Sequence, residues 1–183
     1  MKNYLIHHGI LGQKWGVRRF QNKDGTRTEL GKRHTKSDFN VTTKKGETLK
    51  VELNKTPAPA KVLSKISKTI ADNVEKTSNY TIKNENEKVG TLQLHRESPM
   101  ELNVVWIDTK KAHKGKGYAS AVMDGVIKNA KKDGYEYVTL EVPGISPDAA
   151  HIYQKLGFEY VETLSTPEDD PAWQGLTALR RNL

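Results

Sequence analysis

The stretch HKGKGYASAVM, residues 113–123, places two glycines among lysines directly before a run with helical apolar spacing. A helix N-terminus leaves several backbone N–H groups unpaired and carries about half a positive charge. Gly115 and Gly117 have no Cβ, so a ligand can approach their backbone, and Lys114 and Lys116 add positive charge. These features predict a site for a phosphate or diphosphate group at the start of the helix.

Three classes of cofactor use a turn of this kind. A nucleotide-binding P-loop needs Gly-Lys-Ser or Gly-Lys-Thr after four spacer residues, and this turn has no such sequence. A dinucleotide-binding turn reads Gly-x-Gly-x-x-Gly close behind its strand, whereas this chain has Ser120 at the third position. Coenzyme A is the third class.

The elements around the turn indicate a mixed sheet. Apolar patterns predict, in order, a hairpin (39–54), a helix (59–76), three strands (79–84, 88–97 and 101–108), a helix (119–132), a strand (137–142), a helix (147–156, capped by Ser146), a strand (158–164) and a last strand at the C-terminus. This order predicts an α/β (α+β) fold, with a mixed central sheet of about six to seven strands flanked by helices and one crossover in its middle.

Composition divides the chain into two regions. The net charge is +8, and residues 1–38 hold nine basic and three acidic residues, so residues 39–183 are nearly balanced. We expect a basic N-terminal segment (1–38), docking or disordered, and one domain (39–183), with nucleic acid disfavoured as the main partner.

The absence of cysteine excludes disulfides and thiolate catalysis. No metal site is expected, and no apolar run approaches the roughly 18 residues that cross a membrane.

Residues 104–162 resemble the GNAT superfamily of N-acetyltransferases. The family's phosphate motif, Arg/Gln-x-x-Gly-x-Gly/Ala, is matched by KGKGYA (114–119), except that Lys114 replaces Arg or Gln. The second motif, Asn-Pro-x-Ala-x-x-x-Tyr-x-x-x-Gly-Phe, is matched by SPDAAHIYQKLGF (146–158), except that Ser146 replaces Asn. The resemblance implies a GNAT-like fold, acetyl-CoA as the donor, and direct attack by a primary amine of a protein lysine or a small molecule.

The resemblance also implies the site residues. In the family, the strand before the phosphate turn separates from its neighbour and pairs with the pantetheine arm. Cofactor binding is therefore expected at Ile107, Asp108, Thr109, Lys114, Gly115, Lys116, Gly117, Tyr118, Ala119, Ser146 and Tyr153.

Three residues are candidates for proton transfer. Tyr153 would protonate the leaving thiolate, or else it packs on the core. Asp108 and Glu141 are the candidate bases; the alternatives are that Asp108 simply ends a strand and that Glu141 faces solvent.

Other polar and aromatic residues have more ordinary expected roles. We expect Trp106 and Trp173 to pack in the core, although they could line an acceptor pocket. His113 and His151 are expected to be surface or packing residues. The acidic stretch 167–173, PEDDPAW, is expected to be a solvated turn, or else part of an acceptor site for a cation.

The stretch HHGILGQKWGVRRFQNKDGT, residues 7–26, resembles a short module of proteins from tailed phages and prophages of Gram-positive bacteria. This implies a phage origin, a location in the host bacterial cytoplasm or packaged in the virion, and a phage head or host protein partner for residues 1–38. The alternative function is a non-catalytic virion, structural or acyl-CoA-binding protein with a GNAT fold.

Overall fold

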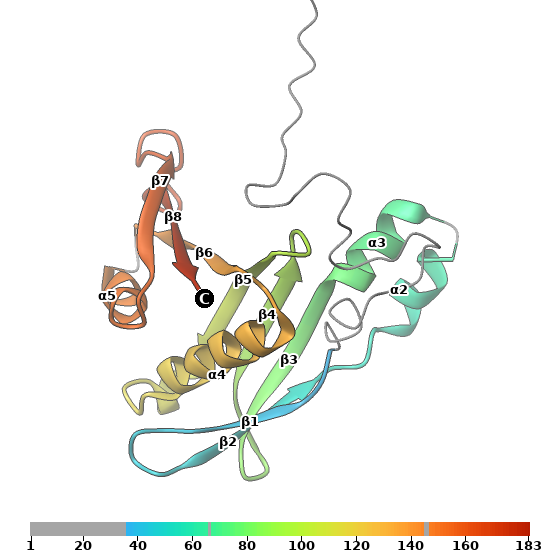
Figure 1. Cartoon of the computed structure of the whole chain (residues 1–183), viewed down its shortest axis with the longest axis horizontal. Coiled ribbons are helices and arrows are strands. Elements are labelled where there is room, and N and C mark those ends of the chain that lie inside the picture. Colours follow the sequence, from blue (N-terminus) through green and yellow to red (C-terminus); the bar gives the residue numbers. More distant parts are fainter. Residues whose placement is uncertain (1–35, 66, 145–146) are drawn as a thin grey trace, which may run out of the picture.

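The computed structural model describes residues 36–65, 67–144 and 147–183, and eight strands in these ranges form one sheet (Figure 1). The strands are β1 (Phe39–Thr42), β2 (Thr48–Leu53), β3 (Thr77–Asn84), β4 (Glu87–Arg96), β5 (Glu101–Thr109), β6 (Tyr137–Pro143), β7 (Glu159–Ser165) and β8 (Leu176–Asn182). The helices are α2 (Ala58–Leu63), α3 (Lys68–Lys76), α4 (Tyr118–Asp133) and α5 (Pro147–Lys155), with a 3₁₀ turn, η1, at Lys111–His113.

The sheet order is β1-β2-β3-β4-β5-β6-β8-β7, and β5 and β6 form its one parallel pair among the described residues. The helix α4 connects these two strands, so the predicted mixed sheet with a central crossover is confirmed. The strand count exceeds the expected six to seven because both strands of the first hairpin and the C-terminal strand join the same sheet.

The helix α4 forms the centre of the core. It begins after Gly117 (φ 80°) and ends at Gly134 (φ 84°), and both glycines adopt the left-handed conformation. A Cβ on Gly125 would clash with a Val41 methyl group, so the helix backbone packs directly on β1. The apolar stripe of α4 is buried, namely Val122, Met123, Val126, Ile127 and Ala130.

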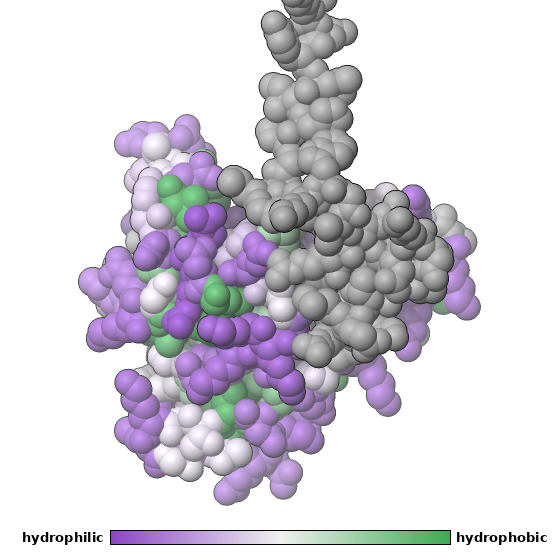
Figure 2. Space-filling model, viewed as in Figure 1, coloured by the Kyte–Doolittle hydropathy of each residue, from purple (hydrophilic) through white to green (hydrophobic). Residues whose placement is uncertain are grey.

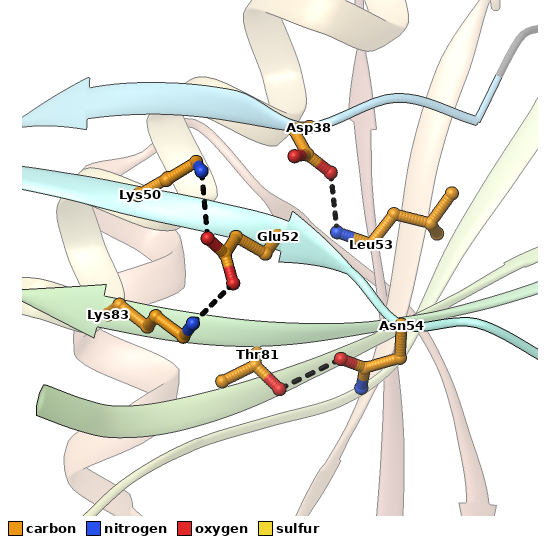
Figure 3. A network of polar contacts seen from close by, with 7 residues as sticks. All are labelled: Asp38, Lys50, Glu52, Leu53, Asn54, Thr81 and Lys83. Atoms are coloured by element: carbon orange, nitrogen blue, oxygen red, sulfur yellow. Dashed lines mark hydrogen bonds and ion pairs between the residues drawn. The ribbon is translucent and has the colours of Figure 1, made fainter. Parts of the chain in front are cut away.

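The opposite face of the sheet is polar. On β2, Glu52 lies between Lys50 (2.8 Å) and Lys83 of β3 (2.6 Å), two lysines that are directly opposite in register (Figure 3). Glu52 therefore offsets the repulsion between them. Beside this cluster, Thr81 Oγ1 donates to Asn54 Oδ1 at 2.9 Å.

The single helix predicted over 59–76 is wrong. The chain forms two helices, because Ser67 takes an extended conformation (φ −133°, ψ 119°) and caps α3 by accepting from the Ile70 N–H at 3.4 Å. Val62 and Leu63, expected in an apolar stripe, are 62% and 45% exposed. The proposed cap at Ser146 lies outside the described residues.

The surface in the view of Figure 2 is mostly hydrophilic, with small and separate hydrophobic patches. In the described ranges, no helix combines the length and the apolar character that crossing a bilayer requires.

Asp133, the last residue of α4, should destabilise the fold at neutral pH. Burial raises its pKa from 3.8 to about 6, and the negative C-terminal end of the helix also disfavours a carboxylate. The folded state thus binds the proton more tightly than the unfolded state, so the stability present below pH 4 is lost as pH rises through 6. Asp133→Asn should therefore raise the free energy of unfolding at pH 8 by about 1 kcal/mol, allowing for partial solvent screening.

At pH 4 the same substitution should change the free energy of unfolding little, and urea denaturation at both pH values checks this. Asp124→Asn is the control, because Asp124 is on the same helix, has a side chain that is 49% exposed, and pairs with Lys128 at 2.6 Å. An equal change at pH 4 and pH 8 for Asp133→Asn would contradict the prediction.

Candidate functional site

The strands β5 and β6 separate in the middle of the sheet. They pair only between Glu101–Val104 and Tyr137–Leu140. Beyond this point β5 continues alongside β4, and β6 continues alongside β8. A β-bulge at Val105, where the register with β4 shifts, marks the point of separation. Among the described residues, the edge of β5 from Val105 to Thr109 therefore has no strand partner, as the family resemblance implied.

The free edge of β5 is followed by η1 and then by the glycine turn, residues 114–117. The Lys110 N–H donates to Val89 O at 2.8 Å, and η1 then reverses the chain toward α4. Gly115 (φ 77°) and Gly117 (φ 80°) are left-handed, and a Cβ on either would have no atom within 4 Å. The N-cap residue of α4 is Gly117, which has no side chain to cap the first turn. The turn thus presents backbone and open space where a diphosphate would bind.

The side chains of the turn point in different directions. Lys114 and Lys116 are exposed, so their charges are available to an anion. Tyr118 is 1% exposed, so its side chain belongs to the core and only its backbone faces the turn. His113 is also buried, which confirms the packing alternative for this residue, whereas His151 is exposed.

The predicted residues of β5 lie on different faces of the strand. Ile107 is opposite Leu92 and packs against the core, so it can offer only its backbone edge to a ligand. Asp108 is opposite Thr91 and is exposed. Thr109 Oγ1 is buried and has no hydrogen-bond partner among the described residues. A polar atom left in this state at the end of the free edge is compatible with a polar ligand there.

Glu141 and Tyr153 come from the two elements that follow α4, namely β6 and α5. Glu141 is exposed and is the first residue of β6 after the last pair with β5. Tyr153 of α5 is half-buried, and its ring packs edge-on against Phe158 at 5.8 Å between centroids. Burial raises the pKa of the Tyr153 phenol, which therefore stays protonated at neutral pH.

The expected core packing of the two tryptophans is wrong. Trp106 is 51% exposed because it follows the bulge, on the part of β5 that β6 no longer flanks. Trp173 is 42% exposed in the loop between β7 and β8. The acidic residues of that loop are mostly exposed, and Asp169 Oδ2 accepts from the Thr166 hydroxyl at 2.8 Å.

Sequence reasoning missed the bulge at Val105 and the support of the glycine turn by the β3–β4 hairpin. The run VVWID gives no sign of a bulge, since every residue in it suits a strand. In the hairpin, Asn84 and Glu87 resemble ordinary turn residues, and only the sheet topology places them next to the glycine turn.

Comparison with known proteins supplies the family. The model of the acetyltransferase (GNAT) family matches residues 51–158, more than half of the chain. An uncharacterised N-acetyltransferase of Bacillus subtilis (strain 168), YsnE, is 34% identical over 65 residues. That alignment spans 34% of this chain and 43% of the relative, so the chain covers less than half of that protein.

Two solved structures have similar folds. A GNAT family acetyltransferase from Elizabethkingia anophelis with acetyl-CoA bound has a TM-score of 0.59 and 19% identity, over 74% of this chain and 98% of that chain. An acetyltransferase from Bacillus subtilis in complex with CoA has a TM-score of 0.56 and 21% identity, over 74% of this chain and 99% of that chain. Both matches establish a GNAT-like α+β fold.

Proposed function

Because the chain belongs to the GNAT family of acetyltransferases, we propose that it binds acetyl-CoA and transfers the acetyl group to a primary amine. The observation that carries this proposal is the free edge of β5, which is followed, after η1, by a helix N-terminus lined and capped by glycine. The two similar structures solved with acetyl-CoA or CoA support it. The acceptor is a protein lysine or a small amine.

The proposed ligand contacts follow from the geometry. The backbone of Ile107, Asp108 and Thr109 would pair with the pantetheine arm, and residues 114–119, the glycine turn with the start of α4, would hold the diphosphate. Bound acetyl-CoA would supply a thioester, whose carbonyl carbon gains a bond to the amine nitrogen while the bond to sulfur breaks. Tyr153 would give its proton to the departing sulfur.

The acceptor must lose a proton before it attacks. An alkyl amine with a pKa of about 10.4 is protonated at pH 7, and its deprotonation costs about 4.6 kcal/mol. Glu141 is better placed than Asp108 to take this proton, because Glu141 lies where the two strands separate. Asp108 lies next to the end of β5, close to the turn assigned to the diphosphate.

Glu141→Gln should lower kcat/KM for the amine by about tenfold at pH 7. This is below the usual contribution of a general base, because Glu141 is exposed and water can partly replace it. The loss should shrink toward pH 10, where the amine loses its proton unaided. Asp108→Asn, the matched change on β5, should keep kcat/KM within about twofold of the parent protein. Measuring CoA release from pH 7 to 10 checks both variants. A larger loss of kcat/KM in Asp108→Asn than in Glu141→Gln would identify Asp108 as the base.

The proposed function is tested by acetyl-CoA itself. At about 100 times Kd, acetyl-CoA should stabilise the protein by about 2.7 kcal/mol, seen as a rise in Tm. A panel of primary amines should then show acceptor-dependent CoA release. An unchanged Tm at saturating acetyl-CoA would refute the cofactor assignment, and binding without CoA release for any amine or host lysate would favour the non-catalytic alternative.

A role for the N-terminal segment rests on the sequence alone. We infer that this segment docks the enzyme on a phage head or host bacterial protein, as the phage-like module implies. Residues 36–38 belong structurally to the domain, since the Asp38 carboxylate accepts from the Leu53 N–H at 2.8 Å (Figure 3). A truncation that removes residues 1–35 should therefore keep activity on a small amine and lose only the docking.

A further inference from the structure

The β3–β4 hairpin contacts the glycine turn on both of its sides. Before the turn, His113 Nε2 donates to Glu87 Oε1 at 3.0 Å. After the turn, the Tyr118 hydroxyl accepts from Asn84 Nδ2 at 2.9 Å. Asn84 ends β3 and Glu87 begins β4, so the two contacts come from the two ends of one short hairpin turn.

The two anchored side chains also contact each other. The rings of His113 and Tyr118 stack with 5.9 Å between centroids and 21° between planes. His113 is 8% exposed and Tyr118 is 1% exposed, so the stack is a rigid base under the turn. Between the two residues, the exposed segment 114–117 is free to face a ligand.

The turn needs such a base because its own conformation is weakly determined. Two of its four residues, Gly115 and Gly117, are left-handed glycines, which lose the most conformational entropy when they are ordered. The orientation of the backbone N–H groups that would bind a diphosphate is therefore set by the contacts that hold the two ends of the turn. The His113 hydrogen bond lowers the pKa of Glu87, so the carboxylate remains charged over the physiological range.

We propose that Asn84 and Glu87 are positioning residues, which hold the glycine turn through Tyr118 and His113 in the shape that binds the diphosphate of coenzyme A. This inference rests on the proposed function. It adds the β3–β4 hairpin to the elements that support coenzyme binding. For Glu87 it predicts an effect on Kd opposite in sign to that of simple electrostatics.

Electrostatics alone predicts tighter coenzyme binding when an acid near the turn is removed, because the ligand is an anion and Lys110 and Lys116 lie near Glu87. The positioning role predicts weaker binding, because the His113 ring loses its anchor. Glu87→Ala tests the sign of the change in Kd for CoA without disrupting the core, since the Glu87 side chain is 61% exposed and its removal leaves no cavity.

The experiment is calorimetric titration of the full chain with CoA and with pantetheine, which lacks the diphosphate. Glu87→Ala should raise Kd for CoA about tenfold, the effect of losing one hydrogen bond to a charged group, and should leave Kd for pantetheine unchanged. Glu85→Ala is the matched control: Glu85 lies in the same turn and has no side-chain hydrogen bond or ion pair to the described residues, so its removal should leave Kd for CoA unchanged or lower.

The pathway through His113 is tested by a double-mutant cycle. In a His113→Phe background, which keeps a ring for stacking on Tyr118, Glu87→Ala should not weaken CoA binding further and should leave Kd for CoA unchanged or lower. Unchanged or tighter CoA binding in Glu87→Ala, or an equal loss for CoA and pantetheine, would overturn the positioning role. Failure of the parent protein to bind CoA would instead refute the proposed function.

Discussion

Gly117→Glu should lower kcat/KM for acetyl-CoA by about 10³-fold, mainly through KM. Gly117 immediately precedes α4, and a Cβ there would project into space free of protein atoms within 4 Å. In the proposed function that space holds the diphosphate, so the new carboxylate would occupy its site and repel it. Loss of one hydrogen bond to a charged group costs about 1.5–3 kcal/mol, and a blocked diphosphate loses several such bonds at once.

The matched control separates this effect from backbone strain. Gly46, in the β1–β2 turn, also has a left-handed φ (86° against 80° for Gly117) and also has no atom within 4 Å of a built Cβ. Both Gly→Glu changes should therefore cost about the same free energy of unfolding, roughly 1–2 kcal/mol, which thermal denaturation measures. Only Gly117→Glu should abolish the rise in Tm with acetyl-CoA. Equal kinetic losses in both variants would show that strain, not the site, explains the result.

The sequence predicted local features of the site better than its long-range ones. Gly115 and Gly117 ahead of an apolar stripe predict an open turn before a helix, and both glycines are left-handed just before α4. The start and end of α4 followed from its apolar stripe and from Gly134. Each of these features depends on residues that are close together in the chain.

The remaining features depend on contacts between distant segments. Trp106 is exposed because β6 leaves β5 after Val104, and nothing in residues 101–109 records where the neighbouring strand departs. The support of His113 by Glu87 joins residues 26 positions apart. Ser67 acts as a helix cap only because the backbone is extended there, while its apolar neighbours continue the helical pattern. Periodicity alone therefore merged α2 and α3 into one helix.

Tyr153→Phe should lower kcat about 10²-fold and leave KM for acetyl-CoA nearly unchanged. General acid catalysis contributes about 10²–10⁴-fold, and the departing thiolate is the group that needs the proton. Burial raises the pKa of Tyr153 above that of an ordinary phenol, so Tyr153 is protonated at neutral pH, and the loss should be constant between pH 7 and 9.

The core-packing alternative for Tyr153 predicts a different result for the same substitution. Phenylalanine keeps the edge-on contact with Phe158, and the Tyr153 hydroxyl makes no hydrogen bond to any residue that the structure describes, so Tm should not fall. A variant with unchanged kcat would thus assign Tyr153 to packing alone. Tyr160→Phe is the control, because Tyr160 is 64% exposed on the edge strand β7 and its hydroxyl forms a hydrogen bond with Thr163 Oγ1. A loss of kcat in Tyr153→Phe with none in Tyr160→Phe would identify Tyr153 as the proton donor.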